Sequence, residues 1–336
     1  MAVAQVRDVA ALAGVSPATV SNALNHPAKV SPTTLARIQA AIDGSGYIRN
    51  DAARQLRAGT NRAIGMIVLD IANPFFTDVA RGVDDVLIAE HRPLILGNSS
   101  QEPMRETNYL DLFEQQRMDG VLITPVGDVL DRLRRLRDRG TSVVVVDRMT
   151  RTKEFSSVAI DDKMGGRIAT EHLLESGRRN IAFIGGPANL AQIKNRLSAA
   201  RAAVEAHGDA QLRFVETDAM NAEAGRTGVE QLLSLPKDQH PDAVFAANDL
   251  VALGVLQALI LRGVRVPDDI AIVGYDDIDF AASSAIPFTS VRQPAHEMGS
   301  TASVLLLGVI ADPEGSKVQH VTLKPELVIR RSTTGA

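Results

Sequence analysis

Polar and aromatic side chains follow several of the apolar runs in this sequence, and they are of types that bind small molecules. Phe75 and Phe76 come soon after the run 64–69, and two adjacent aromatic rings at the end of a strand can stack on a sugar or a base. Asp276 follows another such run, and a carboxylate accepts hydrogen bonds from hydroxyl groups. Arg196 carries a guanidinium fork that can hold vicinal hydroxyls or a carboxylate. This chemistry is recognition rather than bond making.

Motifs that would indicate an enzyme do not occur in the sequence. There is no P-loop, no His-Glu-x-x-His, no Gly-x-Ser-x-Gly and no dinucleotide-binding fingerprint. The seven His residues have no metal-ligand spacing, and the absence of Cys excludes disulfides and Cys-based metal sites. We therefore expect no catalytic residue, no metal and no cofactor.

The elements that position these side chains are predicted by the rhythm of the chain after residue 61. Apolar runs alternate with helical stretches, and the runs are continuous, which is typical of parallel strands covered by helices on both faces. One sheet would be very large for this number of strands, so we expect two doubly wound lobes with a ligand crevice between them. The predicted strands are 64–69, 93–97, 120–124, 141–147, 180–184, 214–217, 243–246 and 270–275, and the predicted helices are 77–90, 104–116, 129–139, 196–207 and 248–262.

The first 60 residues contain short helical patterns and no strand-like run. A helix over 7–13 ends at Gly14, the usual residue of a left-handed C-cap, and Ser16 followed by Pro17 begins a second helix over 17–25. This is the pattern of a helix-turn-helix, whose second helix lies in the major groove of DNA. Taken alone, the pattern leaves open a small helical domain that binds protein. The expected shared core is Val9, Ala13, Val15, Val20 and Leu24.

Charge is distributed unevenly along the chain, which has a net charge of −4. Residues 1–60 carry a formal charge of +3 and the remainder carries −7. A basic head on an acidic body is expected when only the head meets phosphate. The N-terminus does not read as a signal peptide and no window reads as a membrane span, so we expect a cytoplasmic protein with no membrane partner.

The segment 6–21, VRDVAALAGVSPATVS, resembles the N-terminal signature of the LacI/GalR family almost position for position. The resemblance extends over essentially the whole chain. It implies a transcription regulator, in most cases a repressor, that binds a pseudo-palindromic operator in double-stranded DNA as a homodimer. Beyond the signature, the matching positions in the head are Val30, Ser31, Ile38, Ile42, Gly46, Tyr47, Asn50, Ala53, Arg54 and Leu56.

In this family the start of the second helix reads bases, and Pro17, Ala18 and Asn22 occupy those positions here. Many members carry Arg at the position of Asn22. Asn bonds an adenine edge whereas Arg prefers guanine, so we expect an operator that deviates from the commonest family site. Phosphate contacts, which position the head without reading sequence, are expected from Ser16, Thr19, Ser21, Asn25 and Tyr47.

The segment 50–57 resembles the hinge helix of the family, and it is too short to be stable alone. The resemblance implies that it forms when two chains pair on DNA, with Asn50 at its start. Leu56 would then insert between base steps in the minor groove and kink the duplex. Arg49 stands where Pro is common in the family.

The resemblance also implies an effector site in a periplasmic-binding-protein-like body. It places Phe75 and Phe76 at the ligand mouth, and we expect one ring in the core and one against the ligand. Met220 stands where relatives often present an aromatic ring, so strong stacking is not expected there. The predicted ligand residues are Phe75, Phe76, Arg148, Arg196, Met220, Asn248 and Asp276, with Ser99, Ser100 and Gln293 as weaker candidates.

The predicted architecture is α/β, with an all-α helix-turn-helix head and a two-lobed, doubly wound parallel-sheet body. We expect the DNA-binding domain at 1–48 and the hinge helix and linker at 49–60. The N-terminal lobe is expected to comprise 61–161 plus 291–324, and the C-terminal lobe 162–290 plus 325–336.

The function predicted from these features is ligand-responsive transcription regulation, with a small, ribose-like sugar as effector. A purine- or nucleoside-responsive repressor of the same fold is the alternative within this class. A pure sugar-binding protein and an α/β enzyme with a regulatory head are the alternatives outside it. We expect a dimer without an added tetramerising helix, formed through the helix 253–259 and through Ala80, Val83 and Leu87 of the helix 77–90.

Overall fold

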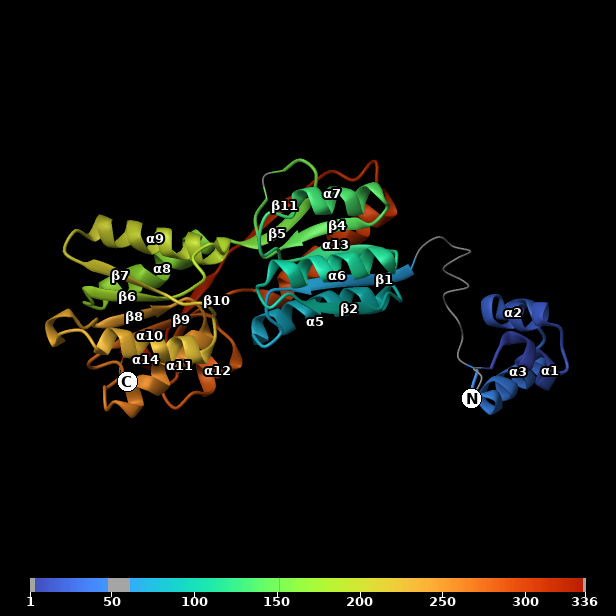
Figure 1. Ribbon diagram of the computed structural model, residues 1–336, viewed down its shortest axis with the longest axis horizontal. Helices are drawn as coiled ribbons and strands as arrows, with labels where there is room; N and C mark the ends of the chain where they lie inside the picture. Colours follow the sequence, from blue (N-terminus) through green and yellow to red (C-terminus); the bar gives the residue numbers. More distant parts are fainter. Residues whose placement is uncertain (1–3, 48–60, 151, 335–336) are drawn as a thin grey trace. The chain divides into compact units, whose positions relative to one another are not determined.

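The structure is a computed structural model that describes residues 4–47, 61–150 and 152–334. The chain divides into two compact units, 1–60 and 61–336 (Figure 1), which are described separately below.

The head confirms the predicted helix-turn-helix. Gly14 ends the first helix in the left-handed region with φ 63°, and the Ser16 side chain accepts a hydrogen bond from the Thr19 N–H at 3.1 Å. The left-handed Gly14 and the Ser16 hydrogen bond are the C-cap and the N-cap that the sequence predicted. The helices are α1 (Val6–Ala13), α2 (Pro17–Asn25), the 3-10 turn η1 (Pro27–Lys29) and α3 (Pro32–Ser45).

A small core holds the three helices of the head together. Val9, Ala13 and Val20 are buried as predicted, whereas Val15 and Leu24 are only partly buried against this core. Helix α3 contributes Ile38, which the sequence analysis did not include. Arg37 of α3 also donates hydrogen bonds to the carbonyl oxygens of Ala13 and Gly14, which fixes α3 against the turn of the motif.

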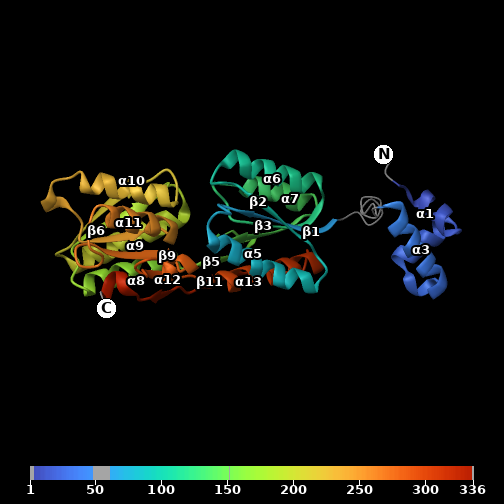
Figure 2. The ribbon, with the colours of Figure 1, turned by 90° about the horizontal axis from the view of Figure 1, so that it is seen from below.

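The first lobe of the body is a wholly parallel six-stranded sheet in the order β11-β5-β4-β3-β1-β2. Helices α5 and α13 cover one face and α6 and α7 cover the other (Figure 2). The elements are β1 (Asn61–Val68), α5 (Pro74–Ala89), β2 (Leu94–Asn98), α6 (Pro103–Gln115), β3 (Met118–Ile123), α7 (Leu130–Asp138), β4 (Ser142–Val146), β5 (Ser156–Ile160), α13 (Ala295–Ala311) and β11 (His320–Leu323).

The second lobe repeats this plan in the order β12-β10-β9-β8-β6-β7, with β12 antiparallel to β10. Helices α8 and α9 pack on one face, and α10 and α11 pack on the other. The elements are α8 (Asp162–Glu175), β6 (Asn180–Gly185), α9 (Ala191–His207), β7 (Gln211–Glu216), α10 (Ala222–Leu233), η2 (Lys237–Gln239), β8 (Ala243–Ala246), α11 (Asp249–Leu261), β9 (Ala271–Asp276), α12 (Asp279–Ser283), β10 (Thr289–Arg292), β12 (Glu326–Val328) and α14 (Arg331–Thr334).

The chain passes between the lobes three times. It crosses from β5 to α8 at residue 161, from β10 back to α13 at 293–294, and from β11 to β12 at 324–325. The carboxyl ends of β1, β4, β8 and β9 therefore come together at the junction of the lobes, where a doubly wound fold binds its ligands.

All eight predicted strands occur in the structure, although their ends differ by a few residues. Helix α9 begins five residues before the predicted start at Arg196. Several elements of the body that the sequence analysis did not predict lie next to the crossings, namely β5, α8, β10, α13, β11 and β12, and others, namely α10, η2, α12 and α14, lie elsewhere in the second lobe.

The predicted dimer face of α5 is wrong. Ala80, Val83 and Leu87 are buried in the core of their own lobe, where α5 packs beside α13. Their helical spacing therefore reports packing within the chain. The large apolar side chain that α5 does expose is Ile88, which is 67% exposed.

Candidate functional site

Side chains from both lobes surround a small cavity at the junction. All of the predicted ligand residues line it except Arg148, and of the weaker candidates Gln293 lines it as well. The lining residues are Leu69, Asn73, Phe75, Phe76, Asp147, Gln192, Arg196, Met220, Asn248, Asp276 and Gln293.

Asp276 stands at the end of β9 and is held from two sides. Its Oδ2 accepts a hydrogen bond from Asn73 Nδ2 of the first lobe at 2.8 Å, and its Oδ1 accepts one from Gln293 Nε2 at 2.6 Å. Burial raises the pKa of Asp276 to about 6, although Arg196 and the two amide donors favour the charged form. A carboxylate in this setting accepts hydrogen bonds strongly and titrates near neutral pH.

Asp147 ends β4 and faces the second lobe. Gln192 Nε2 of α9 donates to its Oδ2 at 2.8 Å and to its carbonyl oxygen at 2.9 Å. Its Oδ1 is buried and has no hydrogen-bond partner among the described residues. Burial, reinforced by the negative charge of Asp162, raises the pKa of Asp147 to about 8. The free oxygen is the kind of group that a bound ligand satisfies.

Arg196 of α9 is buried and rigidly held. Its Nε donates to Asp162 Oδ1 at 2.7 Å, its Nη1 donates to the Ala247 carbonyl at 2.8 Å, and the guanidinium carbon lies 3.5 Å from the centroid of the Tyr275 ring. These contacts fix the plane of the fork before any ligand arrives, so little side-chain entropy remains to be lost on binding.

Asn248 is the N-cap of helix α11. Its Oδ1 accepts a hydrogen bond from the Val251 N–H at 2.9 Å at the start of α11, and its Nδ2 donates to the Met220 carbonyl at 3.2 Å. Because Asn248 also lines the cavity, capping and ligand contact are compatible at this position.

Phe75 and Phe76 lie in the first turn of α5, after the N-cap Asn73. Their rings form an edge-to-face pair with centroids 5.0 Å apart. Both rings are buried in the core of the first lobe and both line the cavity, so the structure does not separate a core ring from a ligand ring as expected.

Arg148, Ser99 and Ser100 lie outside the cavity lining. Arg148 donates to the Gly127 carbonyl, and Ser99 donates to the Val68 carbonyl at 3.0 Å. These contacts organise the loops at the end of the first sheet.

Three hydrogen-bonding residues of the cavity were missed by the sequence analysis: Asn73, Asp147 and Gln192. Asp147 could have been found, because it follows a buried strand in the same way as Asp276. Asn73 precedes a helical Pro and reads as an N-cap alone. Gln192 has no local signal, since only the crossing of the chain between lobes brings it to Asp147.

The predicted base-reading residues Pro17, Ala18 and Asn22 are exposed on α2. Ser16 is exposed, Thr19 and Ser21 are half-buried, and Tyr47 packs against the head core. The predicted contacts through Asn50, Leu56 and the Asn25 side chain lie outside the described part of the chain.

A helix-turn-helix head and a two-lobed body with a buried polar cavity define a ligand-binding DNA regulator. Residues 5–50 match the family of bacterial regulatory proteins, lacI family, and residues 170–333 match the periplasmic binding protein-like domain. The chain belongs to the LacI family of bacterial regulatory proteins.

Relatives of known name or structure cover most of the chain. The HTH-type transcriptional repressor PurR of Aliivibrio fischeri is 33% identical, with 98% of each chain covered. The solved complex of the transcriptional regulator CelR with cellobiose is 30% identical, covers 98% of this chain and 99% of its own, and has a TM-score of 0.71. A LacI family regulator of Enterococcus faecium with bound ribose is 29% identical, covers 80% of this chain and 98% of its own, and has a TM-score of 0.73.

Proposed function

We propose that the chain is a transcription repressor that binds a pseudo-palindromic operator as a homodimer. In this proposal a neutral sugar bound between the lobes controls the affinity for the operator. The carrying observation is the cavity itself: hydrogen-bonding side chains of two lobes converge on one buried space, in a chain that also has a helix-turn-helix. The sugar-bound CelR and Enterococcus structures support this proposal.

The charges around the cavity favour an uncharged effector. Asp147, Asp162 and Asp276 are buried there, close to the buried guanidinium of Arg196. An anionic effector such as a phosphorylated sugar would add a like charge at a site that already raises carboxyl pKa values. Hydroxyl groups, in contrast, donate to carboxylates and amide oxygens and need no counter-charge.

The effector must also separate groups that join the lobes. The cavity measures about 20 Å³, roughly the space of one water molecule. A sugar ring therefore needs the lobes to move apart or the pairs Asn73–Asp276 and Gln192–Asp147 to give way. Effector binding and lobe arrangement are then thermodynamically linked, which is what a regulator requires.

Two larger hollows, of about 240 and 160 Å³, do not compete for this role. One is lined by the start of β6 and β7 and the other by the start of β4 and β5. Both therefore lie at the amino ends of parallel strands, away from the edge where such sheets bind ligands.

A purine or nucleoside is the second candidate effector within the same function. The edge-to-face pair Phe75–Phe76 offers apolar rings to a base as well as to a sugar, and a PurR repressor is 33% identical. Both candidates are effectors that the site would bind through hydrogen bonds and apolar contacts. From the proposed operator binding we infer a cytoplasmic location. As a separate finding, the described part of the chain contains no helix that could span a membrane.

Thermal unfolding against a ligand panel tests the effector class. The panel contains D-ribose, D-glucose, cellobiose, guanine, adenosine and, as the anionic comparison, ribose 5-phosphate. A ligand at a hundred times its Kd stabilises its domain by about 2.7 kcal/mol. A shift with a neutral sugar, followed by a changed gel-shift affinity for the DNA upstream of the gene, supports the proposal. A shift in melting temperature with ribose 5-phosphate alone overturns the assignment of a neutral sugar. If the protein binds no DNA from the region upstream of its gene, the assignment as a repressor is overturned.

A further inference from the structure

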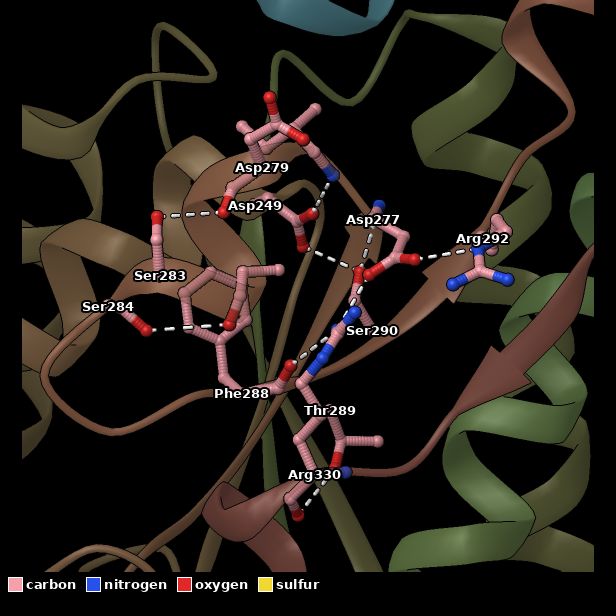
Figure 3. Close-up of polar contacts among 12 residues, drawn as sticks. Asp249, Asp277, Asp279, Ser283, Ser284, Phe288, Thr289, Ser290, Arg292 and Arg330 are labelled. Atoms are coloured by element: carbon pink, nitrogen blue, oxygen red, sulfur yellow. Dashed lines mark hydrogen bonds and ion pairs between the residues drawn. The ribbon is translucent and has the colours of Figure 1, made fainter.

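The backbone that presents Asp276 to the cavity is strained. Asp276 has φ 105° and Asp277 has φ 56°, so two consecutive residues with side chains lie in the region that favours glycine. Such a conformation persists only where the surrounding contacts hold it in place. Those contacts are drawn in Figure 3.

A buried polar network holds this bend from the side of the second lobe. Ser290 of β10 accepts a hydrogen bond from the Asp277 N–H at 3.1 Å and donates to Asp249 Oδ1 at 2.7 Å. The other oxygen of Asp249 accepts from the Ile278 N–H at 2.9 Å. Asp249 is fully buried and directly follows Asn248, so the network connects the segments of two candidate ligand residues (Figure 3).

Arg292 extends this network to the crossings between the lobes. Its Nε donates to Asp277 Oδ2 at 2.7 Å, and its Nη1 donates to Glu326 Oε1 at 2.8 Å. The sheet register explains the arrangement, because Arg292 lies opposite Asp276 in the ladder with β9 and opposite Glu326 in the ladder with β12. The Asp277 side chain is only 4% exposed, whereas the Arg292 side chain is 48% exposed, so this ion pair is partly open to water. Arg330 Nη1 also pairs with the other oxygen of Asp277, at 2.6 Å, so two guanidinium groups hold this carboxylate.

Arg292 lies next to two of the crossings. Gln293, the next residue, begins the second crossing and donates to Asp276. Glu326 is the first residue of β12, immediately after the third crossing. Arg292 therefore touches the turn behind the ligand carboxylate on one side and the end of a crossing on the other.

We propose that Arg292 is a positioning residue that couples the effector site to the lobe crossings, through its simultaneous ion pairs with Asp277 and Glu326. The inference rests on the proposed function for its consequence at the operator, but the linkage itself is a property of the body. When the crossings bend, the ion pair of Arg292 with Glu326 is altered. The ion pair of Arg292 with Asp277, which helps to hold the strained turn that positions Asp276, is then altered as well. Conversely, a ligand that binds Asp276 changes the conformation of the turn, and this change reaches the crossings through the same ion pairs.

Hydrogen–deuterium exchange on the full-length protein without ligand tests the linkage. Glu326→Gln removes one charge at a residue that contacts neither Asp277 nor Ile278 in the structure. We expect the amides of Asp277 and Ile278 to exchange about three- to fivefold faster in this variant, the range that one partly exposed ion pair supports. Arg292→Gln should have at least the same effect.

Glu230→Gln is the matched control, because Glu230 is 62% exposed against 65% for Glu326 and pairs with Arg262 elsewhere in the same lobe. Unchanged exchange at residues 277–278 in Glu326→Gln overturns the linkage. An equal acceleration in Glu230→Gln would also overturn it, because the effect would then follow net charge rather than the network.

The functional arm measures operator affinity with and without D-ribose or cellobiose, beside the Kd for the sugar. We expect Arg292→Gln to weaken sugar binding, because the turn that positions Asp276 is less firmly held, and to lose most of the operator response even when the sugar saturates the variant. A residue that only positions Asp276 would lower the sugar affinity but leave the operator response intact at saturating sugar, and that result contradicts the coupling role. If neither sugar binds the wild type, the neutral-sugar proposal fails, and the exchange experiment still decides the linkage.

Discussion

Asp147 is the cavity residue whose titration is expected to affect the stability of the fold. Its pKa is raised to about 8 by burial and by the nearby charge of Asp162, so the folded state holds a proton that the unfolded chain gives up near pH 4. The stabilising effect of this proton is complete below the unfolded pKa and is lost as the pH rises through the folded pKa. The cost of the buried charge therefore grows between about pH 4 and pH 8.

Asp147→Asn should remove this dependence, because the amide resembles the protonated acid and never ionises. We expect the melting temperature of the variant, relative to the wild type, to rise steadily between about pH 5 and pH 8.5. The difference between the two proteins cancels His172, whose pKa is lowered by burial and whose contribution has the opposite sign. Exposed Asp238→Asn serves as the control. A constant difference across this range would show that Asp147 is ionised throughout.

The sequence predicted residues of the cavity where chemistry and position agree. Asp276 and Asn248 follow buried strands, and parallel topology gathers strand ends at one edge. Arg148, which the sequence also predicted, does not line the cavity: its guanidinium donates to the Gly127 carbonyl, and the preceding residue Asp147 lines the cavity instead. Gln192 could not be predicted, since its partner lies in the other lobe.

At the scale of elements, helix α8 determines how closely Arg196 and Tyr275 can be held. A Cβ built at Gly165 would lie 2.1 Å from the Tyr275 hydroxyl oxygen, and one at Gly166 would lie 2.4 Å from the Arg196 carbonyl oxygen. Real contacts are not this short, so the two glycines allow α8 to approach the site more closely than any other residue would.

Gly165→Ala should therefore push Tyr275 away from Arg196. We expect a loss of about 1–3 kcal/mol in the free energy of unfolding, together with weaker effector binding because the guanidinium loses its stacking partner. Urea unfolding and the thermal-shift panel measure the two effects. Gly308→Ala in α13 is the control, since a Cβ there meets nothing within 4 Å and should be neutral or stabilising. Equal stability of the two variants would contradict the close packing.

Helix α2 presents Asn22 outward, one turn after the exposed Ala18. If α2 reads the operator, Asn22→Arg should change the preferred base from adenine to guanine at one position of each half-site, with a discrimination of about 1–3 kcal/mol. Selection of binding sites from a random DNA library measures this directly. Lys29→Ala, at an exposed position outside α2, should weaken binding to all sequences alike or leave it unchanged. A preference that stays the same in Asn22→Arg would mean that another part of the head reads that base.

At the scale of the whole molecule, the sequence predicted the two-lobed α/β plan from the continuous apolar runs alone. Many of the elements it missed lie at the crossings, where short strands such as β11 and β12 are half-exposed and have no apolar run. Their places in the sheets depend on pairing with distant strands, for example β11 with β5, and local pattern does not report such pairing.

Exposed apolar side chains indicate where two copies of the body would pair. On α11, Leu253, Gln257 and Ile260 share one helical face and are partly or fully exposed, and Phe280 of α12 is 48% exposed. In the first lobe, Leu96 of the edge strand β2 is 38% exposed and Ile88 of α5 is 67% exposed. Helices α5, α11 and α12 lie on the lower side of the two lobes in Figure 1, so a twofold contact there would use both lobes at once.

Ile260→Glu tests this surface. Because Ile260 is 46% exposed, the substitution should leave the fold of each chain intact, while a buried charge at a twofold contact is introduced twice and costs several kcal/mol. We expect a monomer by light scattering and an operator affinity reduced by more than about tenfold, since two heads no longer bind together. Val304→Glu on α13, exposed by 60%, supplies the same charge on another helix and should remain a dimer. If Ile260→Glu stays dimeric while Val304→Glu dissociates, the pairing surface lies on the α13 side, and the lobe movements that reach the heads would have to be transmitted through that helix instead.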